Sequence, residues 1–451
     1  MNKWDYDIII IGAGPAGYVA AIRAGQLGMK TALVEKKEVG GMCLNWGCIP
    51  TKALIESAKL YGRIKSAHTM GIDGIDPEKL NFNWVNSKSR AVQVVKKLTG
   101  GVNYLLKKNG VDVIKGEAVI SSANSVSVEN RKLEAKKILI ATGSYPSKIN
   151  LEIPADKLVQ IEYLLNLESL PKKLVLYGHG PVALELAQFF RMIDLEVSLV
   201  SPQEDILPGI DKYLKEFILK KVKKQGVKIH AGETMEINKD GDLKVGDDLI
   251  SFDMVLNCSW REGIIPDNNT DLKLDDKGFI AVDEHLETSV KGIYAAGDVN
   301  GLSYLAHAAS AQGIFVVNHI QGVHGKIDIN QYPVNVYTVP EISQIGLTEE
   351  QIREKGTEFR IGEFPMTANG KALAEDAGEG FIRILSEKKF GEVLGVQIVA
   401  ANATDLIAEA AAFMSVEATV YDVARTVHAH PTISEVFLEA GMDAADLPIH
   451  K

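Results

Sequence analysis

Two cysteines near the start of the chain are the side chains best suited to covalent chemistry. Cys43 and Cys48 are separated by four residues in GGMCLNWGCIPTK, residues 40–52. Such a pair can close a short loop into a redox-active disulfide if the backbone brings the two Cα atoms within about 7 Å. Two free thiols are the alternative. A zinc site would need a further Cys or His pair, and the third cysteine, Cys258, has no partner motif.

A histidine and a glutamate near the C-terminus are the second candidate site. Residues 427–435 read VHAHPTISE, in which Glu435 can set the tautomer and the basicity of His430. The structural alternative is a helix start, with Thr432 as N-cap and Glu435 closing a capping box, and both interpretations can hold together. We disfavour a metal site at His428 and His430 because no third or fourth ligand is close by in the sequence.

A glycine-rich turn that precedes the cysteines predicts dinucleotide binding. The turn reads GAGPAG, Gly12–Gly17, and lies between a predicted buried strand over Tyr6–Ile11 and a helix. Its first two glycines let the backbone approach a pyrophosphate, which lies at the positive end of the helix. Glu35 ends the next predicted strand, where an acidic residue would bind the adenosine ribose, and a solvent-facing glutamate is the alternative. Directly after such a turn, the cysteine pair favours redox chemistry.

The same plan occurs a second time. A predicted strand, Leu174–Tyr177, leads into GHGPVA, Gly178–Ala183, then a helix and a second strand that ends at Ser201. The first glycine and the residue after the second strand are 23 positions apart in both copies, since 35 − 12 and 201 − 178 are equal. Two such units at equal spacing indicate dinucleotide binding far more strongly than one turn does.

The elements that position these residues follow an α/β pattern. Ala135–Gly143 predicts a strand that ends in a tight turn, and Ile293–Asp298 predicts a further strand. From about Tyr332 a separate α+β domain is expected. Its predicted strands are Phe381–Leu385 and Val393–Val399, and its predicted helices are Asp405–Ala418 and Thr432–Ala440.

Length and charge limit the class of protein. The chain has 451 residues, 46% of them apolar, with 49 Lys+Arg against 59 Asp+Glu and a formal charge of −10. At about 150 residues per domain, this length predicts roughly three domains. The acidic balance argues against nucleic acid and anionic membrane as partners, because both recruit basic patches. We expect a cytoplasmic protein, since no stretch reaches the roughly 18 apolar residues of a membrane span and the N-terminus has no cleavage site.

The cysteine and histidine motifs, ATG at Ala141–Gly143 and YAAGDV at Tyr294–Val299 together resemble the pyridine-nucleotide–disulfide oxidoreductases. The resemblance covers nearly the whole chain and is closest to the dihydrolipoamide dehydrogenases of this family. It implies an α/β fold with two Rossmann-like dinucleotide-binding domains, for FAD and NAD(P), and a C-terminal α+β dimerisation domain. The implied boundaries are 1–146 and 265–330 for the two parts of the FAD-binding and central domain, 147–264 for the NAD(P)-binding domain and 331–451 for the dimerisation domain.

The resemblance assigns roles to the residues around the cysteines. Cys43 would exchange with the disulfide substrate. Cys48 would be the sulfur next to the flavin, where it makes a charge-transfer contact. Lys52 would lie near flavin N5 and pair with Glu185 of the second repeat, for which an exposed helix carboxylate is the alternative.

The resemblance also assigns residues to the flavin and to proton transfer. Asp298 would hydrogen-bond the ribityl chain, and Leu305–His307 would begin a helix whose N-terminal amides face the flavin O2 edge. His430, oriented by Glu435, would deprotonate the incoming dithiol at the cysteines of the other subunit, which implies an obligate homodimer. The residues expected to bind the cofactors are Gly12, Gly14, Pro15, Ala16, Gly17, Glu35, Gly41, Lys52, Thr142, Gly143, Gly178, Gly180, Glu185, Ser201, Gly297, Asp298, Leu305, Ala306 and His307.

The implied activity is oxidation of protein-bound dihydrolipoamide through a Cys43–Cys48 disulfide and FAD to NAD(P)+. The implied partner is the lipoyl domain of a 2-oxo-acid dehydrogenase or related complex. A glutathione-type reductase is the main alternative because Ala183 suits it, although Ile49–Leu54 is closer to the lipoamide enzymes. A non-catalytic assembly subunit is a further alternative, which the retention of the two cysteines with His430 and Glu435 argues against.

The second dinucleotide site departs from the pattern of the family. Ser201 stands where relatives that use NAD have a carboxylate. Ala183 is common among relatives that use NADP, whereas Glu204 and Asp205 would repel a 2′-phosphate. Trp260 replaces the glycine of a Gly-Arg pair and would crowd the site. The choice between NAD and NADP therefore stays open, and so does the hypothesis that nicotinamide binding is weak and another acceptor reoxidises the flavin.

Overall fold

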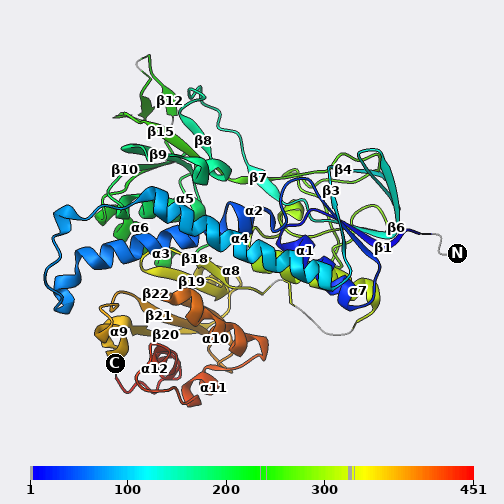
Figure 1. Cartoon of the computed structure of the whole chain (residues 1–451). Helices are drawn as coiled ribbons and strands as arrows, with labels where there is room; N and C mark the ends of the chain where they lie inside the picture. The colour runs from blue at the N-terminus through cyan, green and yellow to red at the C-terminus, as the bar shows by residue number, and fades with distance from the viewer. Residues whose placement is uncertain (1–3, 234, 240, 324–327, 330, 451) are drawn as a thin grey trace. The chain divides into compact units, whose positions relative to one another are not determined.

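The chain forms two compact units in the computed structural model, which describes residues 4–233, 235–239, 241–323, 328–329 and 331–450 (Figure 1). The first unit contains Met1–Tyr177, Glu236–Leu243 and Ile250–Ile329, and the second contains Gly178–Met235, Lys244–Leu249 and Asn330–Lys451. The division into four parts expected from the sequence stays a prediction. Within the described residues, no helix combines the length and the apolar character that crossing a membrane requires.

A seven-stranded sheet forms the centre of the first unit. Its order is β3-β2-β1-β6-β5-β4, and β17 also pairs with β6. β1 is parallel to β2 and β6, and β17 is parallel to β6. β1 reads YDIIII and is almost wholly buried, as expected of a central parallel strand. The bounds are β1 Tyr6–Ile11, β2 Thr31–Glu35, β3 Asp112–Lys115, β4 Ala118–Ser122, β5 Ser125–Val128, β6 Arg131–Ile140 and β17 Ile293–Ala295.

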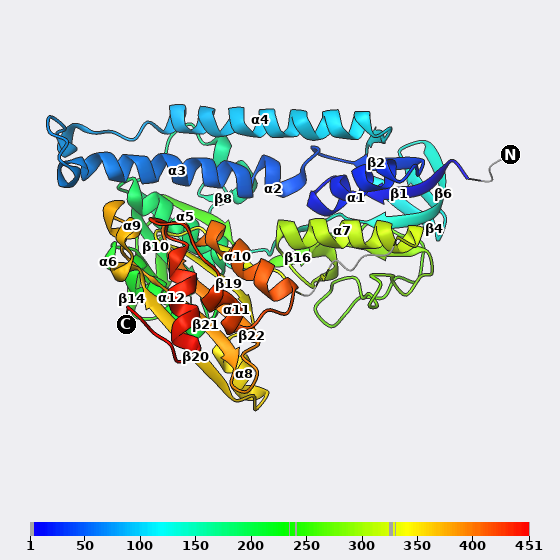
Figure 2. The same cartoon turned by 90° about the horizontal axis from the view of Figure 1, so that it is seen from below.

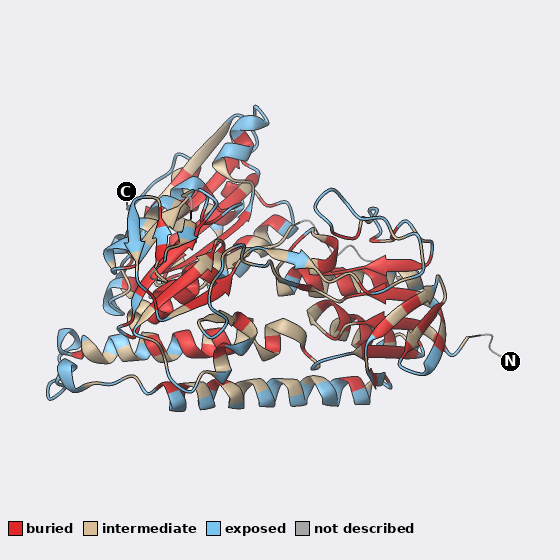
Figure 3. Cartoon of the chain, turned by 90° about the horizontal axis from the view of Figure 1, so that it is seen from above, coloured by how far each residue is buried: buried red, intermediate tan, exposed pale blue. Residues whose placement is uncertain are grey.

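Four helices of the first unit carry or support the predicted site. α1 (Pro15–Gln26) and α7 (Ala306–Gln321) pack so closely that a Cβ at Gly313 would lie 2.4 Å from the Ala16 carbonyl oxygen. α3 (Cys48–Lys65) begins at the second cysteine and lies beside the long α4 (Trp84–Lys108) (Figure 2). The strands beneath them are largely buried, whereas the connecting loops are exposed (Figure 3).

A smaller group of strands follows in the first unit. β8 (Leu158–Gln160), β9 (Lys173–Gly178) and β15 (Met254–Cys258) lie in the order β9-β15-β8, and β15 is parallel to β8. A two-stranded antiparallel ribbon joins β7 (Ser144–Pro146) to β16 (Arg261–Gly263). β9 runs into the second glycine turn, where the second unit begins.

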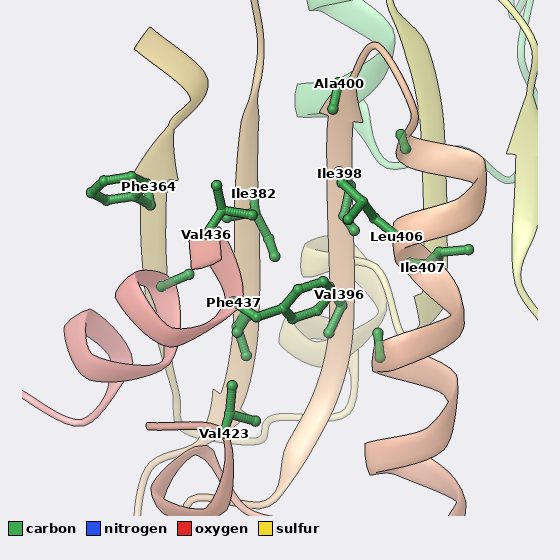
Figure 4. Close-up of a cluster of buried hydrophobic side chains, with 14 of the residues drawn as sticks. Phe364, Ile382, Val396, Ile398, Ala400, Leu406, Ile407, Val423, Val436 and Phe437 are labelled. Atoms are coloured by element: carbon green, nitrogen blue, oxygen red, sulfur yellow. The ribbon is translucent and has the colours of Figure 1, made fainter. Parts of the chain in front are cut away.

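The second unit combines a parallel strand pair with an antiparallel sheet. β10 and β11 are parallel and follow α5, whereas the antiparallel sheet has the order β18-β19-β22-β21-β20. Phe437 of α12, Val396 of β22 and Ile407 of α10 fill the core between this sheet and its helices (Figure 4). The predicted α+β character of this part is confirmed. The bounds are α5 Pro181–Met192, β10 Glu196–Ser201, β11 Lys228–Ala231, β18 Val334–Val336, β19 Glu341–Gly346, β20 Phe359–Pro365, β21 Phe381–Glu387, β22 Val393–Ala400, α10 Ala403–Ser415, α11 Val420–Arg425 and α12 Glu435–Ala444.

One helix boundary differs from the sequence prediction. α12 begins at Glu435 with Ser434 as its N-cap, so Thr432 is not the N-cap and no complete capping box forms. The Thr432 hydroxyl instead donates to the Ala429 carbonyl oxygen at 2.7 Å. The remaining elements are α2 Gly41–Asn45, α6 Lys212–Lys224, α8 Glu349–Glu354, α9 Gly370–Ala374, β12 Met235–Ile237, β13 Leu243–Val245, β14 Asp248–Ile250 and the 3-10 helices Ala67–Met70, Pro77–Lys79, Ile161–Asn166, Asp298–Asn300 and Met366–Ala368.

Candidate active site

The first glycine turn is held in shape by contacts that only glycine allows. Gly12 has a φ of 100°, and a Cβ there would lie 2.3 Å from the Ala141 carbonyl oxygen. A Cβ on Gly17 would lie 1.8 Å from the Gly12 carbonyl oxygen. A Cβ on Gly14, the N-cap of α1, would meet nothing within 4 Å. The turn is therefore closed on its inner side and open at the helix N-terminus, where a pyrophosphate would lie.

Glu35, at the end of β2, stabilises this turn through hydrogen bonds to its carboxylate. One carboxylate oxygen accepts from the Ala13 backbone N–H at 2.7 Å, and the other accepts from the Lys37 backbone N–H at 2.6 Å. Glu35 also lines a cavity of about 230 Å³, together with residues of α4 such as Thr99 and Asn103. A carboxylate beside an open cavity at the end of β2 fits the adenosine end of a dinucleotide.

The two cysteines meet where α2 gives way to α3. Cys43 lies in α2, Cys48 is the first residue of α3, and both are free thiols. A hydrogen bond to Cys48 is the largest cause that raises the pKa of the Cys43 thiol; burial and the charge of Cys48 add to it, and the charge of Lys52 opposes it. Cys48 lies at the N-terminus of α3, a position that favours the thiolate form of a cysteine. The two thiols are in contact, as the predicted redox-active disulfide requires, and the disulfide itself stays a prediction.

Two more side chains belong to the surroundings of the cysteines. Lys52 lies four residues after Cys48 in α3, close enough for its positive charge to lower the pKa of the Cys43 thiol. Burial raises the pKa of the Tyr18 hydroxyl, and the charges of the two cysteines raise it further. Tyr18 had no role assigned from the sequence, although its place in α1 just after the glycine turn is a usable signal. Cys258, by contrast, is buried apart, and burial raises the pKa of its thiol to about 12.

Asp298 is held by two residues that the sequence analysis did not assign. The Ser144 hydroxyl donates to an Asp298 carboxylate oxygen. The Arg261 guanidinium donates to the Ser144 hydroxyl and to its carbonyl oxygen, both at 2.6 Å, and its Nε lies 3.6 Å from Asp298. A cation and a hydroxyl thus fix the carboxylate that is predicted to bind the ribityl chain. No local sequence signal connects Ser144 with Arg261.

The turn around Asp298 is tied to the helix that follows it. The Gln312 side-chain oxygen accepts from the Gly297 backbone N–H at 2.7 Å and from the Asn300 amide at 3.0 Å. Leu305 is the N-cap of α7, so the predicted helix start at Leu305–His307 is confirmed. Nearby, the Thr142 hydroxyl donates to the Ile264 carbonyl oxygen at 2.5 Å, and the following Gly143 has a φ of 76°.

The second glycine turn has a similar backbone but a different strand end. Gly178 and Gly180 have φ values of 141° and 92°, and Gly180 caps α5. Ser201 is fully buried; its hydroxyl donates to the Gln203 carbonyl oxygen and accepts from the Gln203 backbone N–H, both at 3.0 Å. Ser201 therefore serves the turn after β10, and its predicted contact with a cofactor stays a prediction.

Glu185 is not an exposed helix carboxylate. The residue is 3% exposed in α5, and one carboxylate oxygen accepts from the Tyr337 backbone N–H at 2.8 Å. A buried carboxylate requires partners of this kind because burial disfavours its charge. Lys52 and Glu185 belong to different units, and their pairing stays a prediction.

His430 and Glu435 form the expected dyad. His430 Nδ1 lies 2.9 Å from a Glu435 carboxylate oxygen, and the other oxygen accepts from the Thr432 backbone N–H at 2.8 Å. Two hydrogen bonds lower the pKa of the Glu435 carboxyl group: the one from the Thr432 backbone N–H has the larger effect, and the one from His430 has the smaller effect. The His430 side chain is 80% exposed, so with Nδ1 donating to the carboxylate its Nε2 can accept a proton.

A second histidine–glutamate pair supports the same loop. His428 is 6% exposed at its side chain; its Nε2 lies 2.6 Å from a Glu409 carboxylate oxygen and its Nδ1 lies 3.0 Å from the Thr426 carbonyl oxygen. These contacts tie the segment before His430 to α10. Among the described residues, no group of His, Cys, Asp and Glu side chains could hold a metal ion.

The family comparison covers most of the chain. The family model described as "Pyridine nucleotide-disulphide oxidoreductase" matches residues 6–313. A second model, "Pyridine nucleotide-disulphide oxidoreductase, dimerisation domain", matches residues 332–441.

Curated relatives are similar over almost their full length. Dihydrolipoyl dehydrogenase of Bacillus subtilis is 37% identical over 98% of this chain and 97% of its own. The mitochondrial dihydrolipoyl dehydrogenase of Pisum sativum is 37% identical over 98% of this chain and 92% of its own. Leghemoglobin reductase of Glycine max is also 37% identical, over 98% and 88%.

A solved structure supports the fold. LpdA from Mycobacterium tuberculosis superposes with a TM-score of 0.86 at 24% identity, over 96% of this chain and 98% of that one. This likeness confirms the predicted α/β architecture with a C-terminal dimerisation domain. On the strength of the family match and of these relatives, the chain is an enzyme that belongs to the pyridine nucleotide-disulphide oxidoreductase family.

Proposed function

We propose that this enzyme oxidises protein-bound dihydrolipoamide through a Cys43–Cys48 disulfide and passes the electrons by way of FAD to NAD+. The observation that carries the proposal is the contact between the two thiols at the N-terminus of α3. The exposed dyad of His430 and Glu435 supplies the base that dithiol oxidation needs. Several relatives named dihydrolipoyl dehydrogenase support the choice of substrate.

The residues of the first unit fit FAD. The open N-terminus of α1 at Gly14 would hold the pyrophosphate, and Glu35 beside its cavity would hold the adenosine ribose. Asp298, fixed by Ser144 and Arg261, would hold the ribityl chain. When bound, FAD supplies the two-electron chemistry that connects the cysteine pair with the nicotinamide ring.

The cysteines perform thiol–disulfide exchange. His430 Nε2 takes the proton of one substrate thiol, and the resulting thiolate attacks the Cys43 sulfur, so that the Cys43–Cys48 bond breaks and Cys48 leaves as a thiolate. The second substrate thiol then attacks the substrate sulfur of the mixed disulfide and passes its proton to the departing Cys43 sulfur. The substrate disulfide closes, Cys43 leaves as a thiol, and His430 keeps the first proton. The dithiol is oxidised, and the protein disulfide is reduced.

The surroundings of the cysteines favour this order of events. Cys48 lies at the N-terminus of the 18-residue α3, where the helix dipole stabilises a thiolate. The Cys48 thiolate in turn keeps the proton on Cys43, and Lys52 adds a positive charge nearby. Cys48 is therefore the proposed electron donor and Cys43 the proposed exchange thiol.

The proposed assembly is a homodimer. The dimerisation-domain match covers the histidine motif, which supports a site completed by His430 of the partner subunit. The proposed partner protein is the lipoyl domain of a 2-oxo-acid dehydrogenase or related complex, in line with the names of the relatives. We place the enzyme in the cytoplasm, because its three cysteines give no structural disulfide framework.

NAD+ is the proposed nucleotide because the strand-end loop is acidic. Glu204 packs over Gly232, where a Cβ would lie 2.5 Å from the Glu204 Cγ. Asp205 follows it and binds Lys215 at 2.6 Å, which leaves this lysine neutralised. A 2′-phosphate would meet the Glu204 carboxylate, an Asp205 carboxylate paired with Lys215, and no arginine in this loop, residues 201–208.

An anaerobic absorbance titration tests the proposed function. Dihydrolipoamide added to the oxidised holoenzyme should produce a long-wavelength thiolate-to-flavin band, which NAD+ should remove and NADP+ should not. A Cys48→Ser variant should give no band while it keeps FAD. If no band forms in the wild type, lipoamide is the wrong substrate; glutathione, a monothiol that Ala183 favours and of which two molecules form one disulfide, is then the thiol to test.

A further inference from the structure

We propose that Trp260 forms the surface on which the nicotinamide ring of NAD+ stacks. From the sequence alone, Trp260 is expected to crowd the nucleotide site because it stands where the family has a glycine. The inference rests on the proposed function and adds a binding residue to it. The experiment below separates the two because the sign of the change in affinity differs for a stacking surface and an obstacle.

Trp260 lies where a parallel sheet binds ligands. It follows β15 by two residues, and β15 is parallel to β8. In open α/β sheets, ligands bind in the crevice outside the carboxyl ends of the strands. The Trp260 carbonyl oxygen accepts from the backbone N–H and the hydroxyl of Ser147, both at 2.8 Å, so the backbone is held in place there.

The indole is held rigidly yet remains accessible. Tyr304 packs against it edge to face, with ring centroids 5.1 Å apart and an interplanar angle of 75°. The indole N–H, which is the only donor of the side chain, hydrogen-bonds to the Tyr304 hydroxyl. Phe279 supports Tyr304 from 5.9 Å. Trp260 nevertheless stays 39% exposed, so a large aromatic surface is fixed by its neighbours and open to a ligand.

The neighbours of Trp260 place it beside the predicted flavin residues. Arg261, the next residue, binds Ser144, which donates to Asp298. Tyr304 directly precedes Leu305, the N-cap of α7. The ring of the dinucleotide that must reach the flavin for hydride transfer is the nicotinamide. The accessible indole is therefore next to the end of NAD+ that reacts, not the adenosine end.

The charge of the nicotinamide ring makes this contact stronger for the oxidised cofactor than for the reduced one. The indole face is electron-rich, and the oxidised nicotinamide ring carries a positive charge, so the two attract each other. The reduced ring is neutral and loses this attraction. Trp260 should therefore favour NAD+ over NADH, which helps the product to leave.

Calorimetric titration of the oxidised holoenzyme tests the inference without turnover. Trp260→Gly and Trp260→Leu should each bind NAD+ about tenfold more weakly, and Trp260→Phe should restore most of the affinity. ADP-ribose, which lacks the nicotinamide, should bind all four proteins equally. Trp4→Phe is the matched control for loss of a partly exposed tryptophan in the same unit, and FAD content verifies that each variant is folded.

Each other outcome overturns the inference. Tighter NAD+ binding in Trp260→Gly would make the indole an obstacle, and unchanged binding would make it irrelevant. Equal loss for NAD+ and ADP-ribose would indicate an effect on the adenosine end or on the fold. A dihydrolipoamide titration of the same samples tests the proposed function separately, since the thiolate-to-flavin band does not depend on a nucleotide.

Discussion

The two glycine turns of this chain share a backbone plan, but the strand that follows each turn ends in a different kind of residue. In the first, Glu35 at the end of β2 accepts two backbone N–H groups and lines an open cavity. In the second, Ser201 at the end of β10 is fully buried and serves its own turn. Turns with equal spacing along the sequence therefore have a similar backbone. What each site binds depends separately on the residue at the end of the strand.

The largest expected effect comes from the closed inner side of the first turn. Gly12→Ala would strain a backbone with a φ of 100° and place a Cβ 2.3 Å from the Ala141 carbonyl oxygen. We expect a loss of about 3 kcal/mol in the free energy of unfolding, together with loss of FAD. Urea unfolding and flavin absorbance measure both.

Gly28→Ala is the matched control for this change. Gly28 also has a positive φ, 75°, but a Cβ there would meet nothing within 4 Å. It should lose only the left-handed strain of about 1–2 kcal/mol and should retain FAD. Equal losses in the two variants would show that the close contact at Gly12 is unimportant.

The next effect contrasts the two strand ends directly. Glu35→Ala removes a carboxylate from two backbone N–H groups and from the proposed ribose site, so FAD affinity should fall about 100-fold. Ser201→Ala removes the contacts with Gln203 that hold the local turn. It should cost about 1 kcal/mol of unfolding free energy and change NAD+ affinity by less than about twofold.

Flavin release from the apoenzyme and calorimetric NAD+ titration measure these two variants. A large loss of NAD+ affinity in Ser201→Ala would mean that its hydroxyl turns toward the ribose when the nucleotide binds. The strand-end residue of each turn would then bind a ribose, and the proposed difference between Glu35 and Ser201 would be wrong.

A smaller effect concerns the acidic loop after Ser201. Glu204→Arg should raise NADP+ affinity about tenfold, because a cation would replace an anion close to the 2′-position. NAD+ affinity should change little. Glu375→Arg, at an exposed glutamate of the same unit, controls for the change in net charge. If both variants gained NADP+ affinity equally, the effect would be one of overall charge and would say nothing of the loop.

The sequence predicts these turns because all their parts are local. A strand, a glycine turn and a helix each leave a periodic signal, and the two cysteines lie directly after the first turn. Two strands of the C-terminal sheet, β21 and β22, are predictable for the same reason, whereas the start of α7 is implied by the family resemblance.

Contacts between distant segments could not be predicted in this way. Ser144 and Arg261, 117 positions apart, meet because β7 and β16 pair, and only then can they hold Asp298. Trp260 in the sequence suggested only bulk, since its hydrogen bond to Tyr304 depends on the fold. The burial of Glu185 also depends on packing, which a helix pattern alone does not reveal.

The second unit does use a carboxylate to hold a functional turn, at Glu435. The Thr432 N–H and His430 lower the pKa of Glu435 below its ordinary value of 4.5. A carboxyl group whose pKa is lowered in the folded state stabilises the protein above the unfolded pKa and loses this contribution as the pH falls through the folded pKa. Its side chain is 26% exposed, so solvent screening limits the effect to a few tenths of a kcal/mol, roughly that of a surface ion pair.

Glu435→Gln measures that contribution and completes the comparison with Glu35. The unfolding free energy of the wild type should exceed that of Glu435→Gln at about pH 6, and the difference should shrink towards about pH 3. Urea unfolding at a series of pH values gives this difference. A difference that grew as the pH fell would mean that Glu435 is held in its protonated form. Glu435 would then not orient His430 as a carboxylate, and Glu35 would be the only one of the two glutamates that holds its turn by negative charge.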